Sequence, residues 1–208
     1  MTDIDSHETS LLLDRAADGD RSAVNGLMAR YRAELRRVLG IRMAPKLQKR
    51  VDASDIIQET EIEVFERFDS YLARRPMPFR LWLRKTALQR LAKVRERHIK
   101  AAKRSVEDEL SLSAAASAQL CRRLVRSDVP PSQRAMQREL INQVKMILSE
   151  FLDSDREILL MRHVEKMSNV EIGHVLDLSP SAVSKRHVRC LVKLRSMLHQ
   201  RGIEMSGP

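Results

Sequence analysis

Hydrophobic residues recur every three or four positions along most of the chain, which is typical of amphipathic helices. The clearest stripe follows the turn at residues 18–20 and consists of Val24, Leu27, Met28, Tyr31, Leu35, Val38 and Leu39. Similar stripes predict further helices over about 10–17, from 54, from 79, from 132 and over about 153–164. Because no run of alternating β-branched residues favours a strand, the pattern predicts an all-α protein.

The helical pattern weakens between residues 105 and 130, where Ala, Ser and acidic residues alternate before Pro130 and Pro131. Such a stretch is typical of a linker, with at most a transient helix near residues 120–125. We therefore expect two small helical domains, over 10–104 and 131–201, joined by a flexible linker over 105–130. Residues 1–9 are polar and are expected to be disordered, and residues 202–208 form a tail.

The C-terminal domain contains the signals of a helix-turn-helix. Ser168 and Glu171 have the spacing of a capping box, so a first short helix is expected to begin there. Asp177 falls in the turn, where Asp tolerates the left-handed conformation. Ser179 suits an N-cap and Pro180 suits the first position of a second helix. In a helix-turn-helix this second helix enters the DNA major groove.

The second helix has one apolar face, formed by Val183, His187, Cys190, Leu191, Leu194 and Leu198. Its outward residues are candidates for reading DNA bases, because the first turns of this helix reach base edges. They are Ser181, Ser184, Lys185, Val188 and Arg189, and we add the neighbouring Arg186 to the DNA-binding candidates. The alternative is a solvated basic helix on an ordinary bundle.

Charge is unevenly distributed along the chain, whose formal net charge is +10. Residues 79–104 contain ten Lys or Arg and one acid, and residues 179–201 contain six Lys or Arg and no acid. These segments suit a polyanion such as nucleic acid. Residues 52–69 contain seven acids and one Arg, which suits a basic protein surface. Solvated helix faces are the alternative interpretation of all three segments.

Other classes of protein find little support in the sequence. Cys121 and Cys190 lie far apart, and the six His show no metal-ligand spacing, so we expect no disulfide framework, metal or cofactor. The N-terminus lacks a secretion signal and no apolar run is long enough to span a membrane, which favours a cytoplasmic protein without membrane insertion. We find no nucleophile elbow, phosphate loop or paired carboxylates, so we expect no catalytic residues and no enzyme.

Two segments in this order resemble bacterial sigma factors. The first is DASDIIQETEIEVFERF, followed by F-x-x-W-L at residues 79–83. The second begins PSQRAMQREL and continues through DREILLMRHVEKMSNVEIGHVLDLSPSAVSKRHVRCLVKLR. With two domains and a short linker, the chain is similar to the compact extracytoplasmic-function (ECF) group. The resemblance covers residues 10–104 and 131–201.

The resemblance implies a promoter-specificity subunit that binds core RNA polymerase, recognises promoter DNA and helps open it. In the family, the D-x-x-Q-E helix docks on a coiled coil of the largest polymerase subunit. The matching candidates here are Asp55, Gln58, Glu59, Glu61 and Phe65. The family's long basic helix and the loop before it engage the minus-ten promoter element, and the helix-turn-helix reads the minus-thirty-five element. The core-domain DNA candidates are Arg80, Arg84, Lys85, Gln89, Arg90, Lys93, Arg95 and Arg97.

The resemblance also implies that catalysis belongs to the polymerase, and it makes an anti-sigma factor a further candidate partner. Phe79 and Trp82 are expected in the core rather than stacked on bases. The chain departs from the family pattern at Thr86, Gln89 and Lys93, which are positions that bear on minus-ten recognition. The helix-turn-helix has further departures, which are Gly173 for Ala, Asp177 for Gly and His187 for Leu.

A classical dimeric helix-turn-helix regulator, acting without replacing a sigma subunit, is the main alternative function. Such a regulator reads two half-sites as a dimer. No pattern after Leu198 predicts a dimerisation helix, and the acidic segment would have no role in it. Two further alternatives are an enzyme with a DNA-binding appendage, for which we find no catalytic motif, and an inactive homologue or interaction adaptor.

Overall fold

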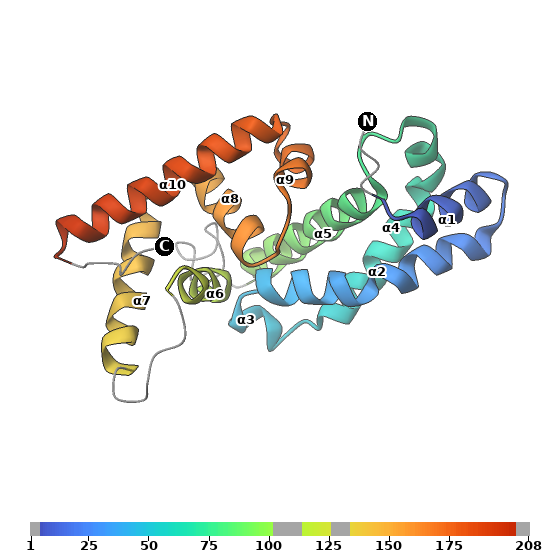
Figure 1. The fold of residues 1–208 in the computed structure, drawn as a ribbon. Helices are drawn as coiled ribbons and strands as arrows, with labels where there is room; N and C mark the ends of the chain where they lie inside the picture. The colour runs from blue at the N-terminus through green and yellow to red at the C-terminus, as the bar shows by residue number, and fades with distance from the viewer. Residues whose placement is uncertain (1–4, 102–113, 126–133, 203–208) are drawn as a thin grey trace. The chain divides into compact units, whose positions relative to one another are not determined.

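The computed structural model describes residues 5–101, 114–125 and 134–202. Every regular element that these residues form is a helix, which confirms the all-α class (Figure 1). The chain divides into two compact units, Met1–Asp108 and Glu109–Pro208. No helix within the described ranges is both long and apolar enough to cross a membrane.

Unit 1 contains five helices. They are α1 (His7–Ala17), α2 (Arg21–Arg42), α3 (Pro45–Gln48), α4 (Ala53–Arg74) and α5 (Phe79–Ala101). Asp20 and Asp52 accept hydrogen bonds from backbone N–H groups two residues later, and so cap the first turns of α2 and α4. Helices α2, α4 and α5 pack against one another, and their apolar faces form most of the core of this unit.

The core of unit 1 is built around aromatic rings. The chain has one Trp, two Tyr and four Phe. The side chains that cluster here are Tyr31, Phe68, Tyr71, Phe79 and Trp82. The rings of Tyr71 and Trp82 lie 4.6 Å apart between centroids, and Phe79 is fully buried. Phe79 and Trp82 are therefore core residues, as the sequence indicated.

The N-terminal end of unit 1 is more ordered than expected. Helix α1 begins at His7, within the segment 1–9 that was expected to be disordered. The Ser6 hydroxyl caps it, and the buried Thr9 hydroxyl lies 2.7 Å from the Tyr31 hydroxyl. These polar contacts order the first turn without adding to the apolar stripe. The short α3 was also missed, and it begins at Pro45 and buries Leu47.

Unit 2 contains α6 (Ala114–Leu124), α7 (Arg134–Ser149), α8 (Asp153–His163), α9 (Asn169–Leu176) and α10 (Pro180–Gln200). Helix α6 is a correction to the sequence analysis, because it falls inside the linker expected over 105–130. It packs against α7 and α8 and buries Ala116, Leu120 and Cys121. Burial of this short stripe explains a stable helix where only a transient one was expected. The expected linker residues 105–113 and 126–130 lie outside the described residues.

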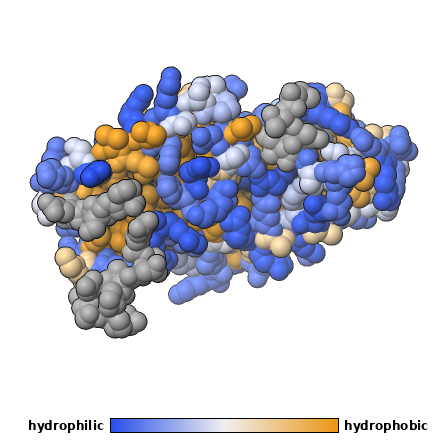
Figure 2. Space-filling view, viewed as in Figure 1, coloured by the Kyte–Doolittle hydropathy of each residue, from blue (hydrophilic) through white to orange (hydrophobic). Residues whose placement is uncertain are grey.

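The remaining core of unit 2 comes mainly from α7, α8 and α10, with Ile172 from α9. Its fully buried residues include Val144, Ile147, Ile158, Leu159, Val183 and Leu198. Cys121 and Cys190 are both buried and unpaired, as expected for a chain without a disulfide framework. Figure 2 shows hydrophilic side chains over most of the visible face of unit 1 and a larger apolar area on unit 2.

Candidate nucleic-acid interface

Helices α9 and α10 form the helix-turn-helix, and its local signals are where the sequence placed them. Ser168 N donates to Glu171 Oε2 at 2.7 Å, and Glu171 N donates to Ser168 Oγ at 3.2 Å, which completes the capping box. Asp177 has a φ of 55° and ends α9 in the left-handed conformation. Ser179 caps α10, and Pro180 occupies its first turn. These caps fix the conformation of the turn between α9 and α10.

The structure explains why the chain has Gly at position 173, where the sigma-factor pattern has Ala. The residue is buried in α9, and a Cβ atom there would lie 2.5 Å from the carbonyl oxygen of Leu178 in the turn. Leu178 N in turn donates to Gly173 O at 3.0 Å. A side chain at this position would therefore push the turn away from α9.

The outward face of α10 carries five of the six DNA-binding candidates. Their side chains project from the first turns of the helix as two cations, two hydroxyls and one apolar group. The five are Ser181, Ser184, Lys185, Val188 and Arg189. The two cations can donate hydrogen bonds to guanine, and the two hydroxyls can donate or accept. The apolar group can contact a thymine methyl group.

Arg186 has a different environment from its neighbours. It donates to the Ser154 hydroxyl at 3.0 Å and lies 3.4 Å from the Asp155 carboxylate, both on α8. Its side chain is only 31% exposed. This geometry favours a role in orienting α10 against α8 rather than in touching bases.

The core-domain candidates on α5 divide into two groups. Four Arg side chains are engaged within unit 1. Arg80 pairs with Glu34, Arg84 is buried, Arg90 pairs with Glu63, and Arg95 donates to the Arg42 carbonyl. Burial alone would raise the pKa of Glu63, but hydrogen bonds from Arg67 and Arg90 hold that pKa below its usual value. These four Arg therefore have structural contacts that the sequence did not reveal.

The second group of candidates on α5 forms a stripe along one side of the helix. Lys85, Gln89, Lys93 and Arg97 follow one another at four-residue spacing. We call this set the α5 stripe. Three cations on one helix face suit the phosphates of duplex or displaced single-stranded DNA.

The polymerase-docking candidates lie on α4. Gln58 is exposed, whereas the Glu59 side chain is 40% exposed and lies 3.6 Å from Arg90. Asp55 lies in the first turn of the helix. Glu61 and Phe65 point instead toward α2, where Glu61 lies 3.4 Å from Arg32. The five residues thus occupy two adjacent faces of one helix.

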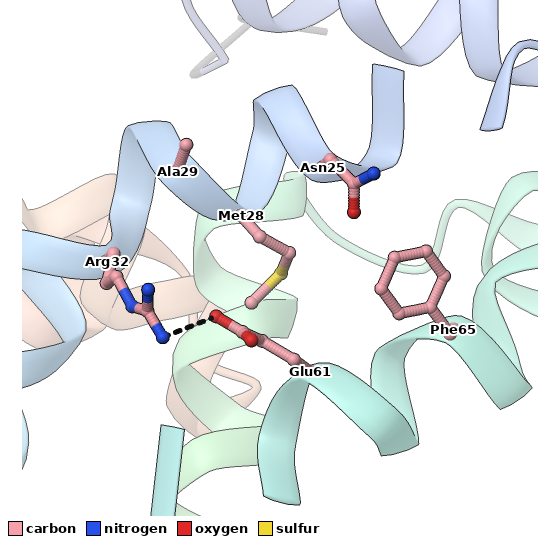
Figure 3. A pocket seen from close by; sticks show the side chains of 6 residues that line it. All are labelled: Asn25, Met28, Ala29, Arg32, Glu61 and Phe65. Atoms are coloured by element: carbon pink, nitrogen blue, oxygen red, sulfur yellow. Dashed lines mark ion pairs between the residues drawn. The ribbon is translucent and has the colours of Figure 1, made fainter. Parts of the chain in front are cut away.

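Glu61 and Phe65 line a shallow pocket between α2 and α4 (Figure 3). The wall on α2 consists of Asn25, Met28, Ala29 and Arg32. Phe65 is 46% exposed, unlike the aromatic residues of the core. The α2 residues were not among the sequence candidates, although Asn25, Ala29 and Arg32 flank its apolar stripe at helical spacing. Aromatic residues are enriched at protein–protein interfaces, so the exposed Phe65 ring makes this pocket a candidate protein-binding surface.

These features define an all-α protein with a helix-turn-helix DNA-binding unit and a second helical unit that carries acidic and basic surfaces. Residues 147–196 match the family model for sigma-70, region 4. Over 79 residues the chain is 33% identical to RNA polymerase sigma-D factor of Bacillus subtilis, covering 37% of this chain and 31% of that protein. It is 27% identical over 190 residues to RNA polymerase sigma factor CnrH of Cupriavidus metallidurans, and the match covers 90% of this chain and 93% of that protein.

A structure of CnrH in complex with the cytosolic domain of CnrY has a similar fold, with a TM-score of 0.52 and 19% identity. The match covers 93% of this chain and 99% of that chain. The region 4 match and the similarity to CnrH along most of the chain support a sigma factor of the ECF group.

Proposed function

We propose that this protein is a promoter-specificity subunit that binds core RNA polymerase, recognises promoter DNA and helps open it. The observation that carries the proposal is the region 4 helix-turn-helix, with its exposed basic face, in a chain related to a sigma factor over 190 residues. The α5 stripe and the acidic face of α4 supply two further surfaces of opposite charge. One chain thus offers surfaces for DNA and for a basic protein partner.

In this proposal α10 reads the minus-thirty-five element in the major groove. The reading residues are Ser181, Ser184, Lys185, Val188 and Arg189. Arg186 supports them through Ser154 and Asp155. Because phosphate contacts dominate affinity, DNA binding by the free protein is weak and falls steeply with salt.

Unit 1 joins the polymerase to the minus-ten element. Asp55, Gln58 and Glu59 offer acceptors to a basic helical partner, and the pocket around Phe65 extends this docking surface onto α2. The α5 stripe holds phosphates of the separating strands. The domains assigned to these roles are 10–104 and 131–201.

The chain has no catalytic role in this proposal, because the polymerase forms the phosphodiester bonds. It acts in the cytoplasm, where its partners are core polymerase and promoter DNA. An anti-sigma factor is a further candidate partner, since the structure of the relative CnrH contains the cytosolic domain of CnrY.

The direct test of the function is reconstitution. The full chain is mixed with core RNA polymerase and passed over a sizing column, and promoter-dependent transcription from genomic DNA is then measured. Co-elution with selective transcription supports the proposal. Failure to bind core polymerase, combined with specific DNA binding by a free dimer, would favour the classical regulator.

A further inference from the structure

Asp5 connects the beginning of the chain to the first turn of α5. Its Oδ2 atom accepts a hydrogen bond from Phe79 N at 2.8 Å, and its Oδ1 atom accepts one from Arg80 N at 3.4 Å. The first N–H groups of a helix have no partner within the helix, and the helix dipole favours an anion beside them. Asp5 is therefore an N-cap of α5 supplied from 74 residues away.

The segment that precedes this cap, residues 75–78, joins α4 to α5 and is held at several points. Arg75 has a φ of 35°, and its guanidinium lies 3.5 Å from Asp14 on α1. The Tyr71 hydroxyl donates to the Met77 carbonyl at 3.1 Å. Pro76 and Pro78 further restrict the backbone. The connection is thus held in one conformation by α1, by α4 and, at its end, by Asp5.

The connection changes from exposed to buried within a few residues. Arg75 and Pro76 are exposed, whereas Phe79 is fully buried in the aromatic core. The cap at Phe79 and Arg80 therefore lies where an exposed connection is anchored to the core. A loss of the cap would free the end of the connection while leaving the buried Phe79 ring in the core.

We propose that Asp5 is a positioning residue that holds the 75–78 connection in the conformation that captures the melted promoter strand. The inference rests on the proposed function and on the resemblance to sigma factors, which implies that α5 and the loop before it engage the minus-ten element. Asp5 acts through the backbone of α5 and does not itself contact DNA. A preformed connection binds the strand without first being ordered.

A purely structural role for Asp5 can be separated from a positioning role with a matched control. Asp20 is also an N-cap in unit 1, but it caps α2, accepting from Ser22 N at 2.9 Å. The test therefore compares wild type, Asp5→Ala, Asp5→Asn and Asp20→Ala as full chains bound to core polymerase. Asp5→Asn keeps one acceptor oxygen, which can retain the shorter bond from Phe79 N, but it removes the charge and the acceptor for Arg80 N.

Promoter opening is measured by the permanganate reactivity of unpaired thymines, alongside core binding and the melting temperature of each variant. We expect Asp5→Ala to lower the open fraction by roughly fivefold, because an N-cap contributes at the helix end that it holds. Asp20→Ala should open the promoter as wild type does, and Asp5→Asn should give an open fraction between those of wild type and Asp5→Ala. Core binding should be equal for all four proteins.

Each outcome decides between the claims. If wild type opens no promoter, the proposed function fails. If wild type and Asp5→Ala open it equally, the positioning role is wrong and the proposed function stands. Equal losses for Asp5→Ala and Asp20→Ala, or a loss of core binding by Asp5→Ala, would show that Asp5 only stabilises the fold and would also overturn the inference.

Discussion

His163 on α8 and His187 on α10 face each other within the helix-turn-helix unit, with their Nε2 atoms 2.9 Å apart. The rings are tilted by 33° with centroids 5.1 Å apart. Burial, the partner ring and the nearby Lys166 and Arg162 lower the pKa of His163 to about 4. Burial and Arg162 also lower the pKa of His187. Both rings are therefore neutral in the folded unit at neutral pH.

This pair predicts that the helix-turn-helix unit loses stability in mild acid. As the pH falls from about 6.5 toward about 4, the unfolded chain binds protons at His163 and His187 that the folded unit does not bind. The free energy of unfolding therefore decreases over this window. Thermal unfolding followed by far-UV circular dichroism at several pH values measures the effect.

Trp82 supplies the control for this experiment. It is the one Trp of the chain and lies in unit 1, so its fluorescence reports that unit separately. Mild acid should lower the melting temperature of unit 2, followed by circular dichroism, more than the melting temperature reported by Trp82 fluorescence. His187→Leu should reduce this difference. An equal melting temperature of unit 2 at neutral and mildly acidic pH would show that His163 and His187 do not control the stability of this unit.

Lys185 and Arg186 are neighbours in sequence with different predicted roles. Lys185→Ala or Arg189→Ala should weaken promoter binding by about 1–3 kcal/mol, because each removes an exposed donor to bases. Arg186→Ala should instead lower the stability of unit 2, because it removes the contacts with Ser154 and Asp155. Promoter affinity of the holoenzyme and circular dichroism melts separate the two effects. A stable Arg186→Ala with a pure loss of base discrimination would reverse this assignment.

Gln58 offers the cleanest test of polymerase docking. It is exposed on α4, whereas Glu59 lies beside Arg90, so Glu59→Arg would also place two cations together. Gln58→Arg should weaken binding to core polymerase by about tenfold or more, since like charges across an interface oppose association. Asp69→Asn, farther along α4, changes the charge by the same amount and should bind normally. Wild type, Gln58→Arg and Asp69→Asn are compared by their competition with labelled wild type for core polymerase.

Phe79 and Phe65 should differ sharply in their contribution to stability. Phe79→Ala removes a fully buried ring from the aromatic core and should cost about 3–5 kcal/mol of unfolding free energy. Phe65 is 46% exposed, so Phe65→Ala should cost far less and instead weaken core polymerase binding. Denaturant titrations followed by Trp82 fluorescence measure both variants. Comparable losses of stability would place Phe65 in the core rather than at an interface.

Lys85 and Arg90 lie on the same helix but should respond differently to removal. Lys85→Ala should reduce the slope of log affinity against log salt by about one, as expected for a single phosphate contact. Arg90→Ala removes one of the two Arg partners of the buried Glu63 and should destabilise unit 1 by about 1–3 kcal/mol. Salt titrations of holoenzyme binding to minus-ten DNA, with parallel unfolding curves, test the pair. An unchanged slope for Lys85→Ala would exclude it from phosphate binding.

The helix-turn-helix could be read from the sequence because its signals are local. Ser168, Glu171, Asp177 and Ser179 act within three or four residues of themselves, so their spacing alone predicts the caps and the turn. The long stripes of α2 and α5 are predictable for the same reason. Only a transient helix near residues 120–125 was expected in place of α6, because its stripe is short and is buried by contacts with α7 and α8.

The contacts of individual charged residues could not be predicted from spacing. Arg90 and Lys93 look alike in the sequence, yet Arg90 meets Glu63 on α4 while Lys93 remains exposed. The cap that Asp5 gives α5 spans 74 residues, and no local pattern signals it. Such pairings depend on how the helices pack, which the period of a stripe does not specify.

Mapping transcription start sites tests the central claim most directly. Core RNA polymerase is incubated with fragments of the source genome, with and without the full chain, and the new transcript ends are sequenced. The account predicts new start sites preceded by shared minus-ten and minus-thirty-five elements, with Lys185→Ala and Arg189→Ala losing the upstream preference. An unchanged set of start sites with a folded, core-bound protein would contradict a role in promoter recognition.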